Sequence, residues 1–457
     1  MSKIARLNRE WKKVSRVLEA WEGAIDPFLM TPTEEFRRRQ TAVWKSLDEG
    51  GFDVGFVFSD EHYCGDVPYL GGNTNISIEQ VAGLIGPTGF HLIAGLEGGY
   101  VAEQLAGRSG CTVHKAELLQ LADEKYPVAA ERLEDILEAA AGKPLNHIRK
   151  LALLSPRQVI PASLVEHLVR LLGPDRVQDA QERYYRIKYE KSDIEMRLIA
   201  DACKVADAMM RGMLAVLRPG MLETEVAAWA SFIGKELGCE DCGFKVMVGA
   251  NEANRTLIGK ALNRPIRKGD WVHLGVAPTR DGLNSCIRRS VIAVESPAQV
   301  APEQRYRFRF IEQAYRVGHQ KYVEVARDGL PARLQEQALV DFFASKAEEV
   351  SRGVGKPIPL AQLKFYTGTH NAGYTECQEF FGAITLDRHE PLGHPIATML
   401  DVALRGFGSR WNEVIIPGFD YIVIENTLGK YGPRVRTLTR LPLNVQRLVG
   451  NVDELAC

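Results

Sequence analysis

The sequence lacks the features that mark membrane-spanning and secreted proteins. None of its apolar runs approaches the roughly 18 residues that are needed to span a bilayer. Residues 1–23 are amphipathic and basic, but they lack the apolar stretch and cleavage site of a secretory signal. They also contain Glu10, Glu19 and Glu22, acids that transit peptides avoid. We therefore expect a cytoplasmic protein whose leading helix packs on its own fold or on a partner.

The sequence also lacks an excess of charge of either sign, because its formal net charge is −1 at pH 7. A nearly neutral chain has no electrostatic footprint for nucleic acid or for an anionic membrane. We therefore expect a small-molecule partner. An acidic tail, a basic extension and a low-complexity arm are absent as well, which counts against an adaptor protein.

Cysteine pairs are scarce, since only Cys239 and Cys242 among the eight cysteines form a C-x-x-C motif. A zinc ribbon needs a second pair, and a thioredoxin-type motif needs a matching βαβ context. Neither is visible, so a structural role is the simpler reading of this pair. Scattered free cysteines favour a reducing compartment.

What the sequence does contain is two differently organised halves. In the first 180 residues, strands alternate with helices, which indicates an α/β domain. We expect helices over 33–49 and 129–141, and strands over 54–58, 81–86, 90–94 and 150–154. A Pro-Thr-Gly turn at 87–89 joins two of these strands as a hairpin.

The second half opens with a capping box from Ser192 to Glu195 and a long amphipathic helix that ends at 218–220. A second helix is expected over 224–237, and a similar pair recurs over 304–326 and 334–352. Strand-rich sequence follows each pair, including an alternating strand over 418–425. This order predicts an internally duplicated α+β domain, with helix-helix-strand units around a curved antiparallel sheet.

These motifs resemble the pita-bread superfamily, which includes prolidase, aminopeptidase P, methionine aminopeptidase, creatinase and ectoine hydrolase. Residues 186–223 are similar to its entry pattern, 267–282 to its central hairpin, and 367–373 to its glycine-flanked histidine loop. The first half is similar to the smaller domain of the prolidase and creatinase branches. The resemblance implies a homodimer, with residues 1–180 as the N-terminal domain and residues 181–457 as the pita-bread domain.

The resemblance also implies where metal ligands would lie. In the peptidases of the superfamily, two aspartates, a histidine and two glutamates hold two metal ions that activate a bridging water. The matching positions in this sequence are Gly275, Cys286, His370, Met399 or Asp401, and Asp420. Glycine offers no ligand, and one aspartate with one histidine cannot bridge two hard cations. We therefore expect neither a metal nor another cofactor.

The hairpin residues 271–278 are instead similar to creatinase, which breaks carbon–nitrogen bonds with side chains and no metal. The likeness is partial, because residues 249–256 lack the histidine that creatinase carries ahead of this hairpin. Arg288 also stands where creatinase carries an acid.

Five residues are candidates for proton transfer. His370, flanked by small residues, would be the general acid and base, because imidazole titrates near neutral pH. Glu376, Glu379, Asp401 and Asp420 are candidates to orient water or a leaving amine. Each also has a structural alternative, such as a capped loop histidine or a solvated acid.

Four further residues are candidates for substrate binding. Arg288 or Arg289 would hold an anionic substrate in a bidentate fork, or would pair with Asp420 as a structural ion pair. Cys286 would contact the substrate, as a nucleophile or as a small buried side chain. Arg255 is expected to line the same pocket or to lie in solvent.

From these residues we predict a metal-independent, creatinase-like hydrolase that cleaves a C–N bond in a small anionic nitrogenous metabolite. One alternative is a non-catalytic binding protein, a role that this scaffold has in histone-chaperone subunits. Another is a reworked enzyme, either a lyase or one with a mononuclear metal site at Cys286, His370 and Asp420.

Overall fold

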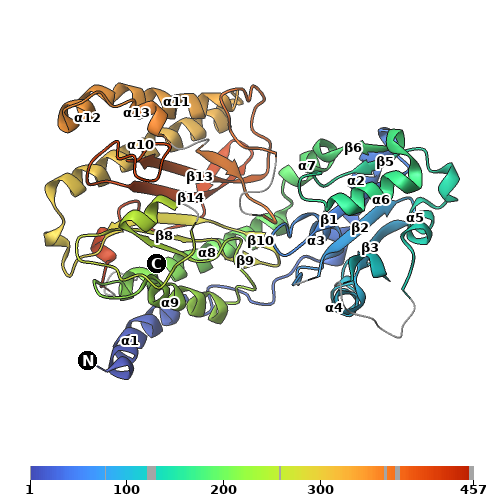
Figure 1. Cartoon of the computed structure of the whole chain (residues 1–457), viewed down its shortest axis with the longest axis horizontal. Coiled ribbons are helices and arrows are strands. Elements are labelled where there is room, and N and C mark those ends of the chain that lie inside the picture. Colours follow the sequence, from blue (N-terminus) through green and yellow to red (C-terminus); the bar gives the residue numbers. More distant parts are fainter. Residues whose placement is uncertain are drawn as a thin grey trace. The chain divides into compact units, whose positions relative to one another are not determined.

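The computed structural model describes residues 2–77, 79–120, 130–256, 259–364, 368–375 and 381–451. The chain divides into two compact units (Figure 1). Unit 1 comprises Met1–Leu29, Lys191–Ala372 and Gly382–Cys457, and unit 2 comprises Met30–Glu190 and Gly373–Phe381. Within the described ranges, no helix has the length and apolar character of a membrane span.

The leading helix α1 (Lys3–Trp21) lies in unit 1, although the predicted division at residue 180 placed it with the first domain. Helix α1 belongs to unit 1 because its apolar stripe is buried there. Val14, Val17 and Trp21 share one core with residues of helix α8 (Asp193–Val216). Of the two expected arrangements, packing on its own fold or on a partner, the structure shows the first.

Unit 2 is an α/β unit built on a six-stranded mixed sheet of order β4-β3-β2-β1-β5-β6. Its strands are β1 (Val54–Ser59), β2 (Val81–Gly86), β3 (Gly89–Ala94), β4 (Thr112–Lys115), β5 (Leu151–Leu153) and β6 (Val177–Asp179). Its helices are α2 (Thr33–Glu49), α3 (Asp66–Gly71), α4 (Leu96–Ala106), α5 (Leu133–Ala141), α6 (Ala162–Leu172) and α7 (Gln181–Tyr189). The expected α/β class and the hairpin between β2 and β3 are confirmed.

Unit 1 contains the antiparallel sheet that the second half predicted, with strand order β12-β13-β14-β11-β8-β7 and β15 paired to β14. These strands are β7 (Met247–Ala250), β8 (Trp271–Val276), β11 (Ile287–Ile292), β12 (Thr369–Asn371), β13 (Ile396–Arg405), β14 (Tyr421–Tyr431) and β15 (Arg434–Thr437). A short hairpin of β9 (Thr279–Arg280) and β10 (Leu283–Asn284) links β8 to β11. The two predicted halves meet where β11 pairs with β14.

Two helix pairs precede the two halves of this sheet, as the duplication predicted. They are α8 with α9 (Glu223–Glu236), and α10 (Pro302–Asp328) with α11 (Arg333–Ser345), followed by α12 (Ala347–Val354) and α13 (Leu360–Leu363). The capping box is present, because the Ser192 hydroxyl accepts from the Glu195 amide and the Glu195 carboxylate accepts from the Ser192 amide. The helix predicted over 334–352 is divided between α11 and α12.

Helices α8 and α10 cover one face of this sheet. Val272 and Leu274 of β8 share a buried core with Met209 of α8, and Asn426 of β14 donates a hydrogen bond to the Tyr315 hydroxyl of α10 at 2.9 Å. Side chains alternate between the two faces along each strand. The opposite face therefore carries the neighbours of these residues in sequence, and the candidate active site lies there.

Candidate active site

One cross-strand row at the centre of the unit 1 sheet carries most of the charged groups of the site. Gly275 of β8 lies opposite Arg288 of β11, Arg288 lies opposite Glu425 of β14, and Glu425 lies opposite Asp401 of β13. Directly paired residues of antiparallel strands point to the same face. Four residues that are far apart in the chain are therefore brought into one line by strand register.

Arg288 is bound by two buried carboxylates. Its Nε atom donates to Glu425 and its terminal Nη2 atom donates to Asp401. Arg288 is 4% exposed, Asp401 3% and Glu425 0%. Burial alone would raise the pKa of Glu425, but Arg288 and His370 together hold it below its usual value. The cluster therefore contains two carboxylates and one guanidinium that neutralises only part of their charge.

Gly275 makes room for this arrangement. A Cβ atom added at Gly275 would lie 2.9 Å from the Arg288 Cγ atom, which is closer than side-chain atoms normally approach. The arginine stem thus occupies the space that a side chain at residue 275 would need. Glycine at residue 275 and arginine at residue 288 are therefore structurally linked.

His370 lies on β12, next to the carboxylate cluster. Its Nε2 atom is 3.5 Å from the Glu425 Oε1 atom, and its side chain is 14% exposed, more than any of the three charged residues. Gly368, two residues before it, allows close approach of the strands, because a Cβ there would be 2.9 Å from the Asp401 carbonyl oxygen. Three of the candidate residues, His370, Asp401 and Arg288, are therefore brought together.

The residues of the site do not fit a dinuclear metal centre. The carboxylates of Asp401 and Glu425 both face a fixed guanidinium, which occupies the cationic centre between them. The two positions that match the metal-binding aspartates of the peptidases are occupied by Gly275 and Cys286. Across the described part of the chain, no group of three or more His, Cys, Asp or Glu side chains could hold a metal ion.

Glu425 is the residue that the sequence analysis missed, because Asp420 was assigned to the position of the last glutamate. In the structure Asp420 precedes β14 and forms an ion pair with Arg255 of the 3-10 helix η4 (Asn251–Thr256). Arg255 also donates to the Trp411 carbonyl oxygen. The predicted pairing of Asp420 with Arg288 or Arg289 is therefore wrong, and Asp420 and Arg255 form a separate ion pair.

Arg289 is not a substrate ligand, since it points to the helix-covered face, where it is 1% exposed. It donates to the carbonyl oxygens of Glu425 and Leu441 and to the Asn426 side chain at 2.7–2.9 Å. These bonds tie β11 to β14 and to the segment after β15. The predicted substrate contact of Arg289 is wrong because adjacent strand residues face opposite sides of the sheet.

Cys286 is fully buried just before β11. Its backbone amide donates to the Thr427 hydroxyl at 3.0 Å, and that hydroxyl donates to the Cys286 carbonyl oxygen at 2.9 Å. A fully buried thiol is poorly placed to act as a nucleophile. Glu376 and Glu379, the remaining predicted acids, lie outside the described residues.

His273 is a second residue that the sequence analysis did not identify. It lies on β8 two residues before Gly275, which places it on the face of Arg288. It is 3% exposed, its ring meets the Tyr421 ring edge-on at 5.3 Å, and neither ring nitrogen has a hydrogen-bond partner among the described residues. Burial and the nearby Arg288 lower the pKa of His273 to about 3, although Glu425 opposes them. The imidazole is therefore neutral at physiological pH, with one donor and one acceptor.

This neutral imidazole predicts a specific loss of stability in mild acid. In the unfolded chain the histidine pKa is about 6.5, so between that pH and about 3 the unfolded state binds the additional proton. Stability should therefore fall as the pH falls. We expect His273→Phe to reduce the loss of unfolding free energy between pH 7 and pH 5 by up to about 2 kcal/mol, measured by urea denaturation. Replacing the exposed His62 with phenylalanine should leave the loss of unfolding free energy between pH 7 and pH 5 unchanged. An equal reduction of this loss in both variants would show that His273 is not the buried neutral group responsible for it.

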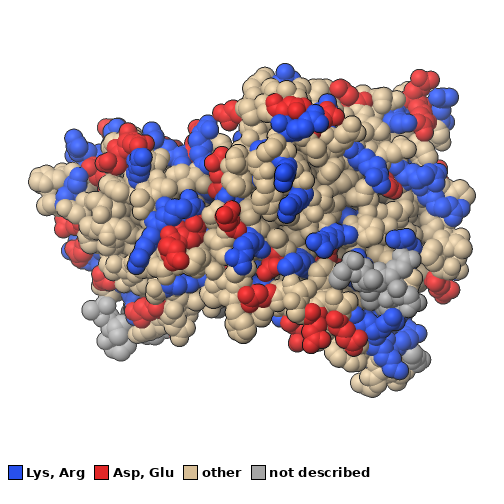
Figure 2. Space-filling model, turned by 180° about the vertical axis from the view of Figure 1, so that it is seen from behind, with Lys and Arg blue, Asp and Glu red and all other residues tan. Residues whose placement is uncertain are grey.

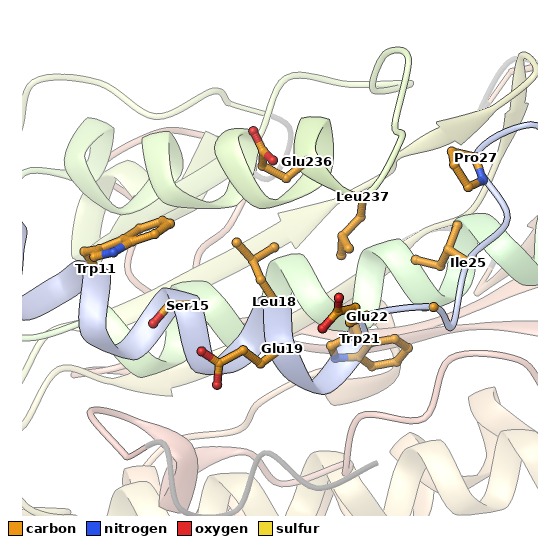
Figure 3. Close-up of a pocket in the computed structure, with 11 residues that line it drawn as sticks. Trp11, Ser15, Leu18, Glu19, Trp21, Glu22, Ile25, Pro27, Glu236 and Leu237 are labelled. Carbon is orange, nitrogen blue, oxygen red and sulfur yellow. The ribbon is translucent and has the colours of Figure 1, made fainter.

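A separate cavity of about 580 Å³ lies in unit 1 between α1 and α9 (Figure 3). Trp11, Leu18, Trp21, Ile25 and Leu237 form its apolar lining, and its acidic residues are Glu19, Glu22 and Glu236. None of the residues of the cross-strand row lines it. Figure 2 shows Lys and Arg side chains interspersed with Asp and Glu over the face in view, in line with the nearly neutral sequence.

Comparison with known proteins gives a consistent result. Residues 197–382 match metallopeptidase family M24. An Xaa-Pro dipeptidase from Pyrococcus horikoshii is 25% identical over 239 residues, which are 52% of this chain and 64% of that protein. A putative dipeptidase, YkvY, from Bacillus subtilis is 27% identical over 257 residues, or 56% of this chain and 65% of that protein. The matches thus span less than two thirds of either relative.

Solved structures extend the likeness over both units. The prolidase from Pyrococcus horikoshii superimposes with a TM-score of 0.68 at 17% identity, covering 90% of this chain and 100% of that chain. The X-Pro aminopeptidase from Thermotoga maritima superimposes with a TM-score of 0.69 at 17% identity, covering 89% and 99%. The family match over residues 197–382 and the likeness to solved structures thus agree, and this chain has the fold of prolidase- and aminopeptidase P-like proteins.

Proposed function

We propose that this protein is a hydrolase that cleaves a C–N bond of a small nitrogenous compound without a metal ion. The observation that carries the proposal is the position of the Arg288 guanidinium between Asp401 and Glu425. A fixed organic cation stands between the carboxylates that would otherwise be available to bind metal. His370, beside this cluster and partly exposed, remains available for proton transfer.

The proposed reaction uses His370 as base and then as acid. Its neutral imidazole removes a proton from water while the water oxygen attacks the carbon of the C–N bond. The resulting imidazolium gives that proton to the departing nitrogen as the bond breaks. Glu425 faces Nε2, and its carboxylate stabilises the imidazolium, while the Asn371 carbonyl oxygen lies 3.4 Å from Nδ1.

The charges of the site alter the substrate class that the sequence indicated. Arg288 already contacts two carboxylates, and Arg289 lies on the other face, so neither arginine supports recognition of an anion. The cluster has one net negative charge with His370 neutral and none with His370 protonated. An amide, urea or amidine group suits a site with so little net charge.

The names of the relatives add one particular C–N bond to the candidates. Two of them are called Xaa-Pro dipeptidases, so the peptide bond before proline belongs among the compounds to be tested. We expect such a substrate to be cleaved, if at all, without metal. A homodimer, a small-molecule substrate, and no nucleic acid or membrane partner complete the proposal.

The proposal is tested with chelator-treated protein whose metal content has been checked. The protein is incubated with amides, cyclic amides, ureas, amidines and Xaa-Pro dipeptides, and released ammonia or amine is measured. We expect turnover of at least one class without added metal, and its loss in His370→Gln. Activity that appears only after addition of manganese, cobalt or zinc would overturn the proposal. Complete inertness toward the panel would favour a binding protein instead.

A further inference from the structure

We propose that Cys239 and Cys242 form a redox-sensitive dithiol, which closes to an intramolecular disulfide when a peroxide oxidises it. The two cysteines lie in the loop that follows α9, in unit 1. Both are reduced thiols in the structure. The inference does not depend on which C–N bond the protein cleaves.

The loop holds the two sulfur atoms in contact. Gly238 turns the chain directly after α9 with a φ of +82°, a conformation that favours glycine. The Cys239 thiol donates to the Asp241 carbonyl oxygen at 2.7 Å and also contacts the Cys242 thiol through a hydrogen bond. Cys239 is 4% exposed, whereas Cys242 is partly exposed. One buried and one accessible thiol therefore meet within a single turn.

The environment makes the two thiols chemically unequal. The hydrogen bond from Cys242 lowers the pKa of Cys239, although burial opposes it, and Lys235 contributes in the same direction. The same hydrogen bond and burial raise the pKa of Cys242 well above its ordinary value. Since the thiolate is the reactive form of cysteine, we assign the attack to Cys239, whose thiol lies next to the partly exposed Cys242.

The reaction balances with peroxide as the oxidant. The Cys239 thiolate attacks one peroxide oxygen, the O–O bond breaks, and one proton is taken up, which gives a sulfenic acid and water. The Cys242 thiol then attacks the Cys239 sulfur. The S–S bond forms, the S–OH bond breaks, and the second water carries away the hydroxyl group and the thiol proton. Sulfur is oxidised and peroxide is reduced.

The loop is positioned to transmit this change to the active site. The Asp241 carbonyl oxygen accepts from the Thr279 amide at 2.9 Å, and the Gly243 amide donates to the Ala277 carbonyl oxygen at 2.8 Å. Ala277 and Thr279 belong to the hairpin region that connects β8, with Gly275, to β11, with Arg288. Disulfide formation removes the hydrogen bond from the Cys239 thiol to the Asp241 carbonyl oxygen. The same carbonyl oxygen accepts the hydrogen bond from Thr279 that joins the loop to the hairpin.

The test treats the reduced full-length protein with hydrogen peroxide, alkylates the remaining thiols and maps the peptides by mass spectrometry. We expect a bond between Cys239 and Cys242, the loss of two hydrogen atoms, and reversal by dithiothreitol. In Cys242→Ser the disulfide should be absent, and dimedone should label Cys239 as the sulfenic acid. Cys203→Ser, which removes a fully buried thiol, should behave like the wild type.

Two results would overturn the proposal. One is that residues 239 and 242 remain free thiols at peroxide concentrations that oxidise the partly exposed Cys111. The other is that Cys242→Ser leaves Cys239 unlabelled by dimedone. Melting curves of the oxidised and reduced protein provide a second readout, in which a shift in the wild type that is lost in Cys242→Ser is expected.

Discussion

Replacing Arg288 with methionine should destabilise the protein by about 3–5 kcal/mol, because it leaves two buried carboxylates without a counter-charge. Asp401 and Glu425 are 3% and 0% exposed, so water cannot take over the role of the guanidinium. The free energy of unfolding, measured by urea denaturation at pH 7, gives the loss. The effect should shrink as the pH falls, since protonation of the carboxylates removes the unpaired charge.

A neutral variant separates loss of charge pairing from loss of packing. In Arg288→Met combined with Asp401→Asn and Glu425→Gln, no buried charge remains unpaired, and most of the lost stability should return. Arg255→Met serves as the matched control, because the Arg255–Asp420 pair is more exposed and should be worth less. A triple variant as unstable as the single variant would mean that Arg288 acts mainly through packing.

Replacing His370 with glutamine should lower kcat by roughly 100-fold to 10,000-fold on any substrate that the enzyme turns over without metal. The amide retains hydrogen-bonding capacity but cannot carry the proton between water and the leaving nitrogen. Stability should change little, because the His370 side chain is partly exposed and lies at the edge of the buried cluster. Steady-state kinetics and urea denaturation of the same preparation distinguish the two effects.

Asp420→Asn is the matched control for this prediction. Asp420 was one of the predicted catalytic acids, but in the structure it pairs with Arg255 outside the cross-strand row. Its kcat should stay within a few-fold of the wild type. A loss in Asp420→Asn as large as that in His370→Gln would show that the two residues act together, contrary to the arrangement described above.

Strand parity explains which part of the site the sequence could predict. Arg288 and Arg289 are adjacent on one strand, so they must face opposite sides of the sheet. The sequence could therefore have shown that only one of them reaches the site. It could not show which one, because the cross-strand register to β14 and β8 depends on contacts between distant segments.

Glu425 could have been found from its surroundings in the sequence. It is the acidic residue within the strand pattern Tyr421–Asn426, whereas Asp420 lies at the edge of that pattern. An acid inside an otherwise apolar strand needs a buried partner. Asp420 and Glu425 are five residues apart, which places them on opposite faces of a regular strand. The pairing of Asp420 with Arg255 of η4 was not predictable, because the two residues are far apart in the sequence.

The fold was more accessible to prediction than the site because local signals specify it. The capping box at Ser192 and the helical spacing that follows it depend on residues three and four apart, and both appear in α8. The hairpin between β2 and β3 follows from a local turn. The place of α1 in unit 1 depends instead on long-range burial of Val14 and Val17, which the sequence does not specify.

Metal binding by the purified protein shows whether the Arg288 guanidinium takes the place of a metal ion. Elemental analysis of protein purified without added metal, followed by titration calorimetry with manganese and zinc, measures both retained and acquired ions. Because Arg288 occupies the cationic centre between Asp401 and Glu425, we predict well below one ion per chain and no saturable heat of binding. One or two tightly bound ions per chain, together with loss of activity on chelation, would show that the site is a metal centre.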